Sequence, residues 1–305
     1  MLYLFLSSAR QAAPLRLKPR MAKLRISVVE YLNTAPLVWG FRHGPLAGKY
    51  DLSYTVPSKC AESLRASRAD VAIIPAIEYQ RIRELVVVPG IAIASKGAVR
   101  SILVVSRMPI EQVRRIALDI SSRSSVALVH LLCAGHWRIR PEFIAAKPVV
   151  STMLKEADAA LVIGDPALRL ALRHGAGEAP VPGVEPIFIY DVAEHWRQWT
   201  GRPCVLAIWA GHRDAITPSV VADFHASKQY GLERIDEIAA NASVQLGLPA
   251  ASLAAYLRDN IDFNLDAENL TGLELLFEKA AYTGLVPQNR PLEFATAPAC
   301  TRAPQ

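Results

Sequence analysis

The chain has 305 residues, which is too many for one ordinary core and suits about two domains. Its hydrophobic share of 51% and charged share of 20% exclude a disordered chain. Four of its 34 basic residues lie in the first twenty positions, and the 30 that remain nearly balance 28 acidic residues, which argues against a nucleic-acid-binding protein.

Residues 1–20 are predicted to be a disordered or non-native extension that precedes the folded chain at Met21. The apolar run Leu2–Leu6 has no preceding basic residue and is shorter than the core of a signal peptide. No later window offers the ~20 uninterrupted apolar residues of a membrane span. The sequence therefore predicts a cytoplasmic protein that does not bind membranes.

The first hundred residues alternate short apolar runs with helical patterns, which is typical of a layered α/β fold. Helices are expected to begin at Pro36, at Pro57 and after Pro75, because proline suits the first turn of a helix. The expected strands are Arg25–Val29, Leu52–Val56, Asp70–Ile74, Leu85–Val88, Ile91–Ala94 and Ser101–Val105.

The same alternation continues from Pro109 to about Gly211, and the chain is then entirely helical. The expected strands are Ile116–Leu118, Ala159–Ile163 and Val205–Trp209. Helices are expected at Ser124–Ala134, Asp165–Arg173, Asp191–Thr200, Pro218–Tyr230, Asp236–Leu246, Ala250–Arg258 and Glu268–Thr283.

This order predicts a discontinuous first domain, residues 21–106 plus 205–290, with residues 107–204 inserted as a second domain. Strands near Ser101–Val105 and Val205–Trp209 would cross between the domains and form a hinge. A small anionic molecule would then bind in the cleft between the domains.

Motifs for metal, nucleotide or redox chemistry are missing from the sequence. There is no GxGxxG, GxxxxGK[ST], HExxH or GxSxG motif, and the seven histidines are dispersed. The four cysteines form no CxxC pair, and unpaired thiols fit a reducing cytosol. We therefore expect neither a metal nor a cofactor.

Three loops that follow strands carry small neutral hydrogen-bond donors, at the sheet edge where α/β proteins bind ligands. Asn33, next to Thr34, could cap a helix or present its amide to a polar substrate group. Gly164 would allow close backbone approach, and Asp165 would cap the helix that follows it.

The third loop combines hydroxyl groups with the start of a helix. Backbone N–H groups at a helix N-terminus bind anions, and hydroxyls add further donors. One serine must cap the helix, and the others exceed that need. The candidate anion-binding residues are Ser121, Ser122, Arg123, Ser124 and Ser125.

Several segments in chain order resemble motifs of one family, the chorismate dehydratases of the futalosine route to menaquinone. The segments are Tyr31–Leu37, Asp70–Tyr79, Ser122–Leu128, Ala157–Asp165 and Trp196–Gly201. The resemblance spans about Arg25 to Ala210, and it implies the two-lobed type II periplasmic-binding-protein-like fold with its ligand cleft between the domains.

The resemblance also implies a reaction, the removal of water from chorismate to give 3-[(1-carboxyvinyl)oxy]benzoate without a cofactor. The product ring is aromatic, so the site needs orientation and charge placement more than a strong base. A carboxylate of the substrate itself can serve as the base. Asn33 would orient the departing hydroxyl or the ring, Ser101 would hydrogen-bond the substrate, and the serine loop would hold a carboxylate.

The chain departs from the family pattern at three places. It has Pro75-Ala76 and Ser124 where family members carry hydroxyl residues and a threonine, respectively. Asp119 places a negative charge beside the expected anion site, and Arg123 is expected to point outward.

Two other functions remain open from the sequence. One is a cytosolic solute-binding or sensor protein for an aromatic carboxylate. The other is the related dihydroxynaphthoate synthase, which uses a histidine base that cannot be placed in this sequence. The oligomeric state is not indicated.

Overall fold

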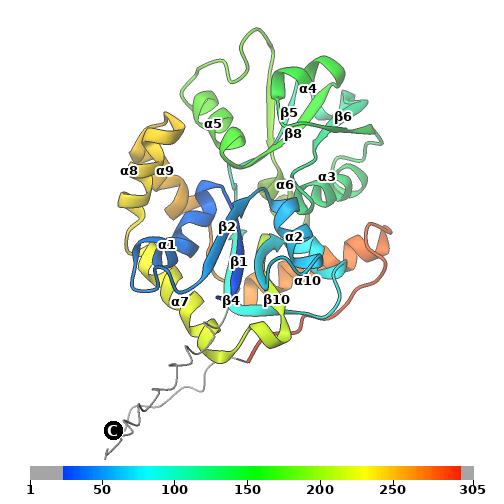
Figure 1. The fold of residues 1–305 in the computed structure, drawn as a ribbon. Helices are drawn as coiled ribbons and strands as arrows, with labels where there is room; N and C mark the ends of the chain where they lie inside the picture. The colour runs from blue at the N-terminus through cyan, green and yellow to red at the C-terminus, as the bar shows by residue number, and fades with distance from the viewer. Residues whose placement is uncertain (1–22, 297–305) are drawn as a thin grey trace, which may run out of the picture.

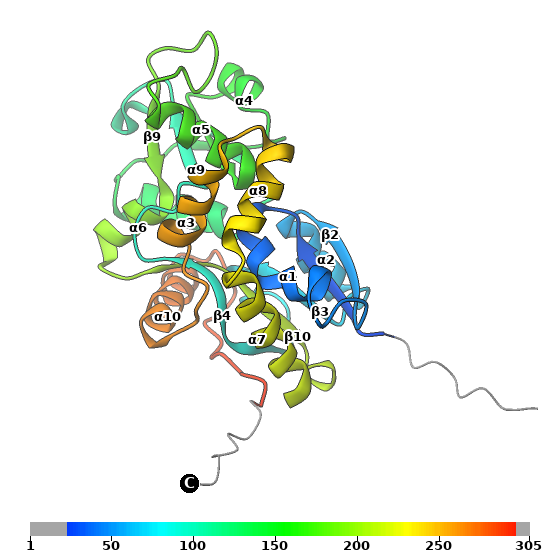
Figure 2. The same ribbon diagram turned by 90° about the vertical axis from the view of Figure 1, so that its left-hand side faces the viewer.

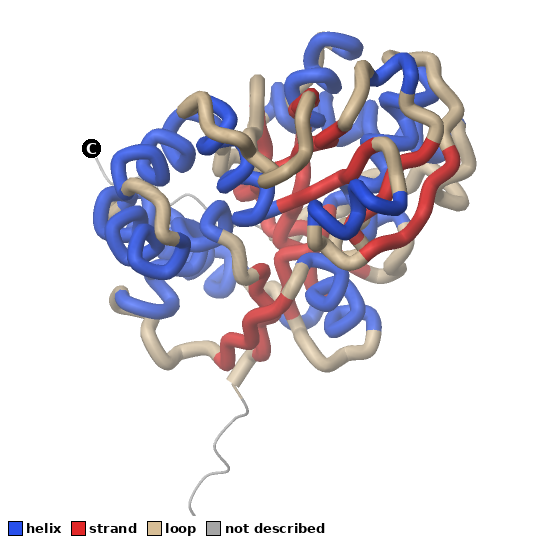
Figure 3. Tube along the Cα trace, turned by 90° about the horizontal axis from the view of Figure 1, so that it is seen from above, coloured by secondary structure: helices blue, strands red, loops and turns tan. Residues whose placement is uncertain are grey.

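The computed structural model describes residues 23–296. The extension predicted at residues 1–20 and Cys300 lie outside the described residues. The described chain forms two lobes, each built on a five-stranded sheet with helices around it (Figure 1). Seen from above, helices lie on both sides of the strands (Figure 3). The two-lobed α/β architecture predicted from the sequence is confirmed.

The first sheet has the order β2-β1-β3-β10-β4. β1, β2 and β3 are parallel, and β10 runs antiparallel to its neighbours β3 and β4. Its strands are β1 (Arg25–Val29), β2 (Asp51–Thr55), β3 (Val71–Pro75), β4 (Leu85–Ser95) and β10 (Cys204–His212). The central strand β3 is buried along its whole length, which explains its continuous apolar sequence.

The second sheet has the order β7-β6-β8-β5-β9. β6, β7 and β8 are parallel, and β5 runs antiparallel to β8 and β9. Its strands are β5 (Ile102–Ser106), β6 (Arg115–Asp119), β7 (Glu142–Ala146), β8 (Ala159–Ile163) and β9 (Phe188–Asp191). β7 and β9 were missed from the sequence, because both are short edge strands with half-buried residues.

Helices cover both sheets. The second lobe carries α3 (Ser124–Gly135), α4 (Val150–Glu156), α5 (Gly164–Gly175) and α6 (Val192–Thr200). The first lobe carries α1 (Ala35–His43), α2 (Pro57–Arg65), α7 (Pro218–Leu232), α8 (Ile235–Leu246), α9 (Ala250–Ala255) and α10 (Ala267–Tyr282). Proline occupies the first turn of α1, α2 and α7, as the sequence predicted for α1 and α2. Figures 1 and 2 place α8 and α9 beside α5 of the other lobe.

Two expectations about the first lobe need correction. The segment expected to end the first domain at residue 106 forms β5, which pairs only in the second sheet. The expected strands Leu85–Val88 and Ile91–Ala94 are one bent strand, β4, whose bend contains Gly90 at φ +72°. We propose that the domains follow the sheets, with crossings at residues 96–101 and 201–203.

No helix in residues 23–296 is long and apolar enough to cross a membrane. In the same residues Cys60, Cys133 and Cys204 are buried free thiols.

Candidate active site

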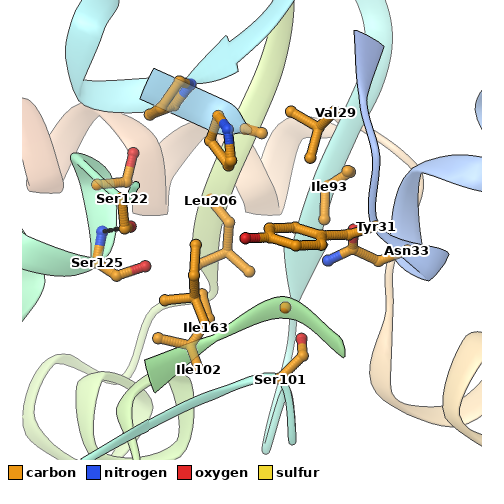
Figure 4. Close-up of a pocket in the computed structure, with 15 residues that line it drawn as sticks. Val29, Tyr31, Asn33, Ile93, Ser101, Ile102, Ser122, Ser125, Ile163 and Leu206 are labelled. Carbon is orange, nitrogen blue, oxygen red and sulfur yellow. Dashed lines mark hydrogen bonds between the residues drawn. The ribbon is translucent and has the colours of Figure 1, made fainter. Parts of the chain in front are cut away.

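The carboxyl ends of β1, β3 and β8 meet between the lobes, and a cavity lies there (Figure 4). Its polar lining comes from neutral groups, namely Tyr31, Asn33, Ser101 and Ser122 with Ser124 and Ser125. Its apolar lining comes from both lobes and includes Val29, Ile93, Ile102, Ile163 and Leu206. No aspartate, glutamate, lysine, arginine or histidine is among the described residues that line it.

Asn33 lies in the short 3₁₀ helix η1 (Leu32–Thr34) between β1 and α1, and it lines the cavity. The capping alternative is not supported, because the N-cap positions of η1 and α1 are Tyr31 and Thr34, without side-chain capping bonds. Thr34 is fully buried and does not line the cavity; its hydroxyl lies 3.4 Å from the Asn33 side-chain oxygen. The Asn33 side chain is thus available to a ligand, and the Thr34 hydroxyl contacts it from the side away from the cavity.

The serine loop precedes α3 and packs against the first lobe. The Ser124 hydroxyl accepts a hydrogen bond from the backbone N–H of Ile77 at 3.2 Å, and the Ser122 hydroxyl accepts one from the N–H of Ser125 at 3.3 Å. In the hydrogen bonds of the described residues, the Ser125 hydroxyl has no partner, and it lines the cavity. Ser125 is therefore the hydroxyl most available to an anion at the start of α3.

Ser121 faces Asp119 instead of the cavity. The Asp119 carboxylate accepts hydrogen bonds from the N–H of Ser121 at 2.8 Å and from its hydroxyl at 2.6 Å. Asp119 is fully buried, burial raises the pKa of its carboxyl, and its second oxygen has no partner among the described residues. Asp119 does not line the cavity, so its side chain is turned away from the expected anion site.

Arg123 lies outside the cavity. Its exposed guanidinium lies 3.8 Å from the Glu62 carboxylate, on the outer side of the loop. This position agrees with the expected outward orientation of Arg123. It does not agree with a role for Arg123 in direct contact with a ligand in the cavity.

Gly164 and Tyr31 form a close contact between the lobes. Gly164 has φ +67°, and a Cβ atom added there would lie 2.6 Å from the Tyr31 ring. The Tyr31 side chain extends across the cavity in Figure 4, and burial raises the pKa of its phenol, so the hydroxyl stays protonated. The position therefore needs glycine both for its backbone conformation and for the ring that packs on it.

Asp165 does not line this cavity and does not act as the N-cap of α5, which is Ile163. Its carboxylate instead accepts a hydrogen bond from the backbone N–H of Leu32 in the first lobe at 3.0 Å. Asp165 lines a second cavity, which shares Val29 and Tyr31 with the first. Tyr31 thus lines both cavities.

In residues 23–296 no group of three or more histidine, cysteine, aspartate or glutamate residues is placed to hold a metal ion.

A family model described as menaquinone biosynthesis matches residues 24–282. The chain belongs to this menaquinone biosynthesis family. It is similar to the chorismate dehydratase of Thermus thermophilus, with 27% identity over 262 residues that cover 83% of this chain and 93% of the relative.

Solved structures show the same fold at low identity. A protein from Archaeoglobus fulgidus superimposes with a TM-score of 0.70 at 17% identity, over 88% of this chain and all of that one. The periplasmic aliphatic sulphonate binding protein of Escherichia coli superimposes with a TM-score of 0.57 at 16% identity, over 92% of this chain and 96% of that one. A Candida albicans protein described as having the generic periplasmic binding protein fold superimposes with a TM-score of 0.61 at 13% identity, over 92% of this chain and all of that one. This member of the menaquinone biosynthesis family therefore has the periplasmic-binding-protein-like fold predicted for it.

Two residues at the site of this family member, Ser101 and Tyr256, differ in whether the sequence predicted them. Ser101 lines the cavity as expected, at the end of the crossing segment 96–101. Tyr256 was not predicted from the sequence, and its hydroxyl lies 2.8 Å from the Ser101 hydroxyl. A lone tyrosine in a helical stretch gives no signal for such a contact, because the two residues are 155 positions apart in the chain.

Proposed function

We propose that this chain is a chorismate dehydratase, a hydro-lyase that converts chorismate into 3-[(1-carboxyvinyl)oxy]benzoate and water. The ring carbon that bears the enolpyruvyl ether loses its proton, and the neighbouring ring carbon loses its hydroxyl. The electron pair of the broken C–H bond becomes part of the aromatic ring, and the proton and hydroxide leave as water.

The lining of the cavity carries this proposal. An aromatising elimination needs a positioned substrate more than a strong protein base, and the lining offers neutral donors without a carboxylate or an imidazole. A carboxylate of the substrate would take the ring proton. The family and the similarity to the Thermus thermophilus enzyme support the same reaction.

The roles follow from position. One substrate carboxylate would bind at the start of α3, where the Ser125 hydroxyl and backbone N–H groups meet the cavity. Asn33 and Ser101 come from the first lobe and from the crossing segment, on the other side of the cavity (Figure 4). They would bind the departing hydroxyl and the ring, while Gly164 and Tyr31 would close the space around it.

The lining also argues against the related dihydroxynaphthoate synthase, whose reaction uses a histidine base. No histidine is among the described residues that line the cavity. Residues of the apolar lining, such as Ile93, Ile163 and Leu206, suit the flat ring of an aromatic product.

We propose further that the protein acts without a cofactor and in the cytosol. Three buried free thiols, Cys60, Cys133 and Cys204, fit a reducing compartment.

The test is incubation of the protein with chorismate, followed by ultraviolet absorbance and by mass detection of the product. We expect loss of chorismate and appearance of a species lighter by one water. Binding of chorismate without consumption would instead support the solute-binding or sensor alternative, and a product other than the benzoate ether would overturn the proposed reaction.

A further inference from the structure

A buried tyrosine lies directly behind the cavity. Tyr256 is 2% exposed and is not among the residues that line the cavity. It begins a π-helical segment, Tyr256–Asn260, which continues from α9. Short π-helical segments are rare and are frequent at functional sites, so this one needs an explanation.

The hydrogen bond between Tyr256 and Ser101 has a defined direction. The Tyr256 hydroxyl donates to the Ser101 hydroxyl oxygen at 2.8 Å. A serine hydroxyl carries one donor proton and two acceptor lone pairs, so this bond leaves the Ser101 proton for another acceptor. Among the described residues that acceptor is the carbonyl of Val99, to which the Ser101 hydroxyl donates a long hydrogen bond of 3.4 Å.

A second contact holds the same two segments together. The side-chain amide of Asn260, at the end of the π-helical segment, donates to the carbonyl of Ala98 at 2.9 Å. Ala98 and Ser101 both lie in the crossing segment 96–101. The wider π turn therefore places both of its ends against the stretch of chain that carries Ser101.

Tyr256 also lies near the other candidate catalytic residue. Burial raises the pKa of the Tyr256 phenol, and the nearby side chains of Ser101 and Asn33 oppose this shift only in part. The phenol accordingly stays protonated and remains a donor. One buried hydroxyl is thus adjacent to both Ser101 and Asn33.

We propose that Tyr256 is a positioning residue that fixes Ser101 as a hydrogen-bond donor to the substrate. Tyr256 occupies one acceptor lone pair of the Ser101 hydroxyl, whose proton forms only a long bond to the Val99 carbonyl. An oxygen of a bound substrate, in the departing hydroxyl or a carboxylate, would replace that carbonyl as the acceptor. This inference rests on the proposed dehydratase function for its chemistry, but the orientation of Ser101 can be tested without it.

The kinetic test is a double-mutant cycle with Tyr256→Phe and Ser101→Ala, measured as kcat and KM for chorismate. We expect Tyr256→Phe to lower kcat about 10-fold with less than a 2-fold change in KM, and to have no further effect in the Ser101→Ala background. Tyr79→Phe is the matched control: its buried hydroxyl contacts Pro291 and Glu293, outside the cavity, and kcat should be unchanged. Equal losses from Tyr256→Phe in both backgrounds, or no loss in the parent, would overturn the proposal.

The structural test does not depend on activity. Crystal structures of the parent and of Tyr256→Phe, both without ligand, should show one Ser101 rotamer in the parent and more than one in the variant. An unchanged single rotamer in Tyr256→Phe would overturn the positioning role. A parent protein that leaves chorismate intact would overturn the proposed function alone, and the Ser101 rotamers would still decide the role of Tyr256.

Discussion

The Asp165 carboxylate accepts a hydrogen bond from the backbone N–H of Leu32, 133 positions earlier in the chain, at 3.0 Å. The two residues belong to different lobes, and together with Tyr31 they line the second cavity. The serine loop makes further bonds of this kind, from Ser58 to the carbonyl of Ser121 and from Ile77 to the Ser124 hydroxyl. The lobes are therefore joined by directed polar contacts at the rim of the site as well as by apolar packing.

Burial raises the pKa of Asp165 to about 6, while Leu32 and Arg169 oppose the shift and Glu30 adds to it. Between about pH 4 and pH 6 the folded chain holds a proton that the unfolded chain has lost. The contribution of Asp165 to the free energy of unfolding therefore falls as pH rises through this range, by about 3 kcal/mol. We expect Asp165→Asn to remove this fall, because the variant does not titrate.

The measurement is urea unfolding of the parent and Asp165→Asn at intervals from pH 4 to pH 7.5. Asp214→Asn, which makes the same change of charge at an exposed position, is the control and should keep the parent's pH dependence. Parallel curves for the parent and Asp165→Asn would show that this carboxyl does not titrate in that range.

Ser125→Ala should weaken chorismate binding more than it weakens the fold. The Ser125 hydroxyl lines the cavity and has no partner among the described residues, whereas Ser124 supports the buried N–H of Ile77. Loss of one hydrogen bond to a charged group corresponds to about 1.5–3 kcal/mol, or roughly 10- to 100-fold in Kd. Calorimetric titration checks this, with Ser151→Ala, an exposed serine on α4, as the control.

Ser124→Ala should lower the melting temperature, which Ser125→Ala should not, because loss of the Ser124 hydroxyl leaves the N–H of Ile77 buried and unpaired.

Equal chorismate affinities of the parent and Ser125→Ala would show that the Ser125 hydroxyl is not part of the anion site.

The sequence was most informative where strands are buried on both faces. The runs that form β3 and β8 are continuously apolar, and their last residues, Pro75 and Ile163, line the cavity. Asn33 and Gly164 were predicted at the site from their positions after strands, Ser101 was predicted from the family resemblance, and all three line the cavity. Edge strands such as β7 gave no such signal, because their side chains are half buried.

The directions in which the side chains of the site point could not be predicted from the sequence. Ser121 through Ser125 are adjacent in the chain, yet Ser121 turns to Asp119, Arg123 turns to Glu62, and Ser125 faces the cavity. Tyr256 was missed for a related reason. Its contact with Ser101 depends on how the C-terminal helices pack on the crossing segment, which no local pattern encodes.

Gly164→Ala should disturb both the backbone and the Tyr31 ring. The added methyl would lie 2.6 Å from that ring, at a residue whose φ of +67° favours glycine. We expect a lower melting temperature and at least a 10-fold lower kcat/KM, because the ring must move within the cavity. Gly175→Ala, at the other end of α5, is the control, since its methyl would meet nothing within 4 Å.

Gly164→Ala should lower the melting temperature less in a Tyr31→Ala background than in the parent, because the clash is absent there and the backbone strain remains. An equal fall in both backgrounds would mean that the ring contact contributes nothing to the loss.

Asn33→Asp separates a substrate-binding role from a structural one. The structure gives Asn33 no capping bond, so the substitution should leave the melting temperature within a few degrees of the parent. The new carboxylate would face a substrate with two carboxylates in a cavity lined by neutral groups, where like charges repel strongly. The amide donor would also be lost.

We therefore expect Asn33→Asp to lower kcat at least about 100-fold, which corresponds to roughly 2.7 kcal/mol in the barrier. Asn289→Asp, which adds the same charge at an exposed position outside the cavity, should keep the parent's kcat. Thermal melts and chorismate turnover of both variants check the prediction. Turnover of Asn33→Asp within a few-fold of the parent would show that this side chain does not contact the reacting part of the substrate, and the departing hydroxyl would then have to be bound from the Ser101 side.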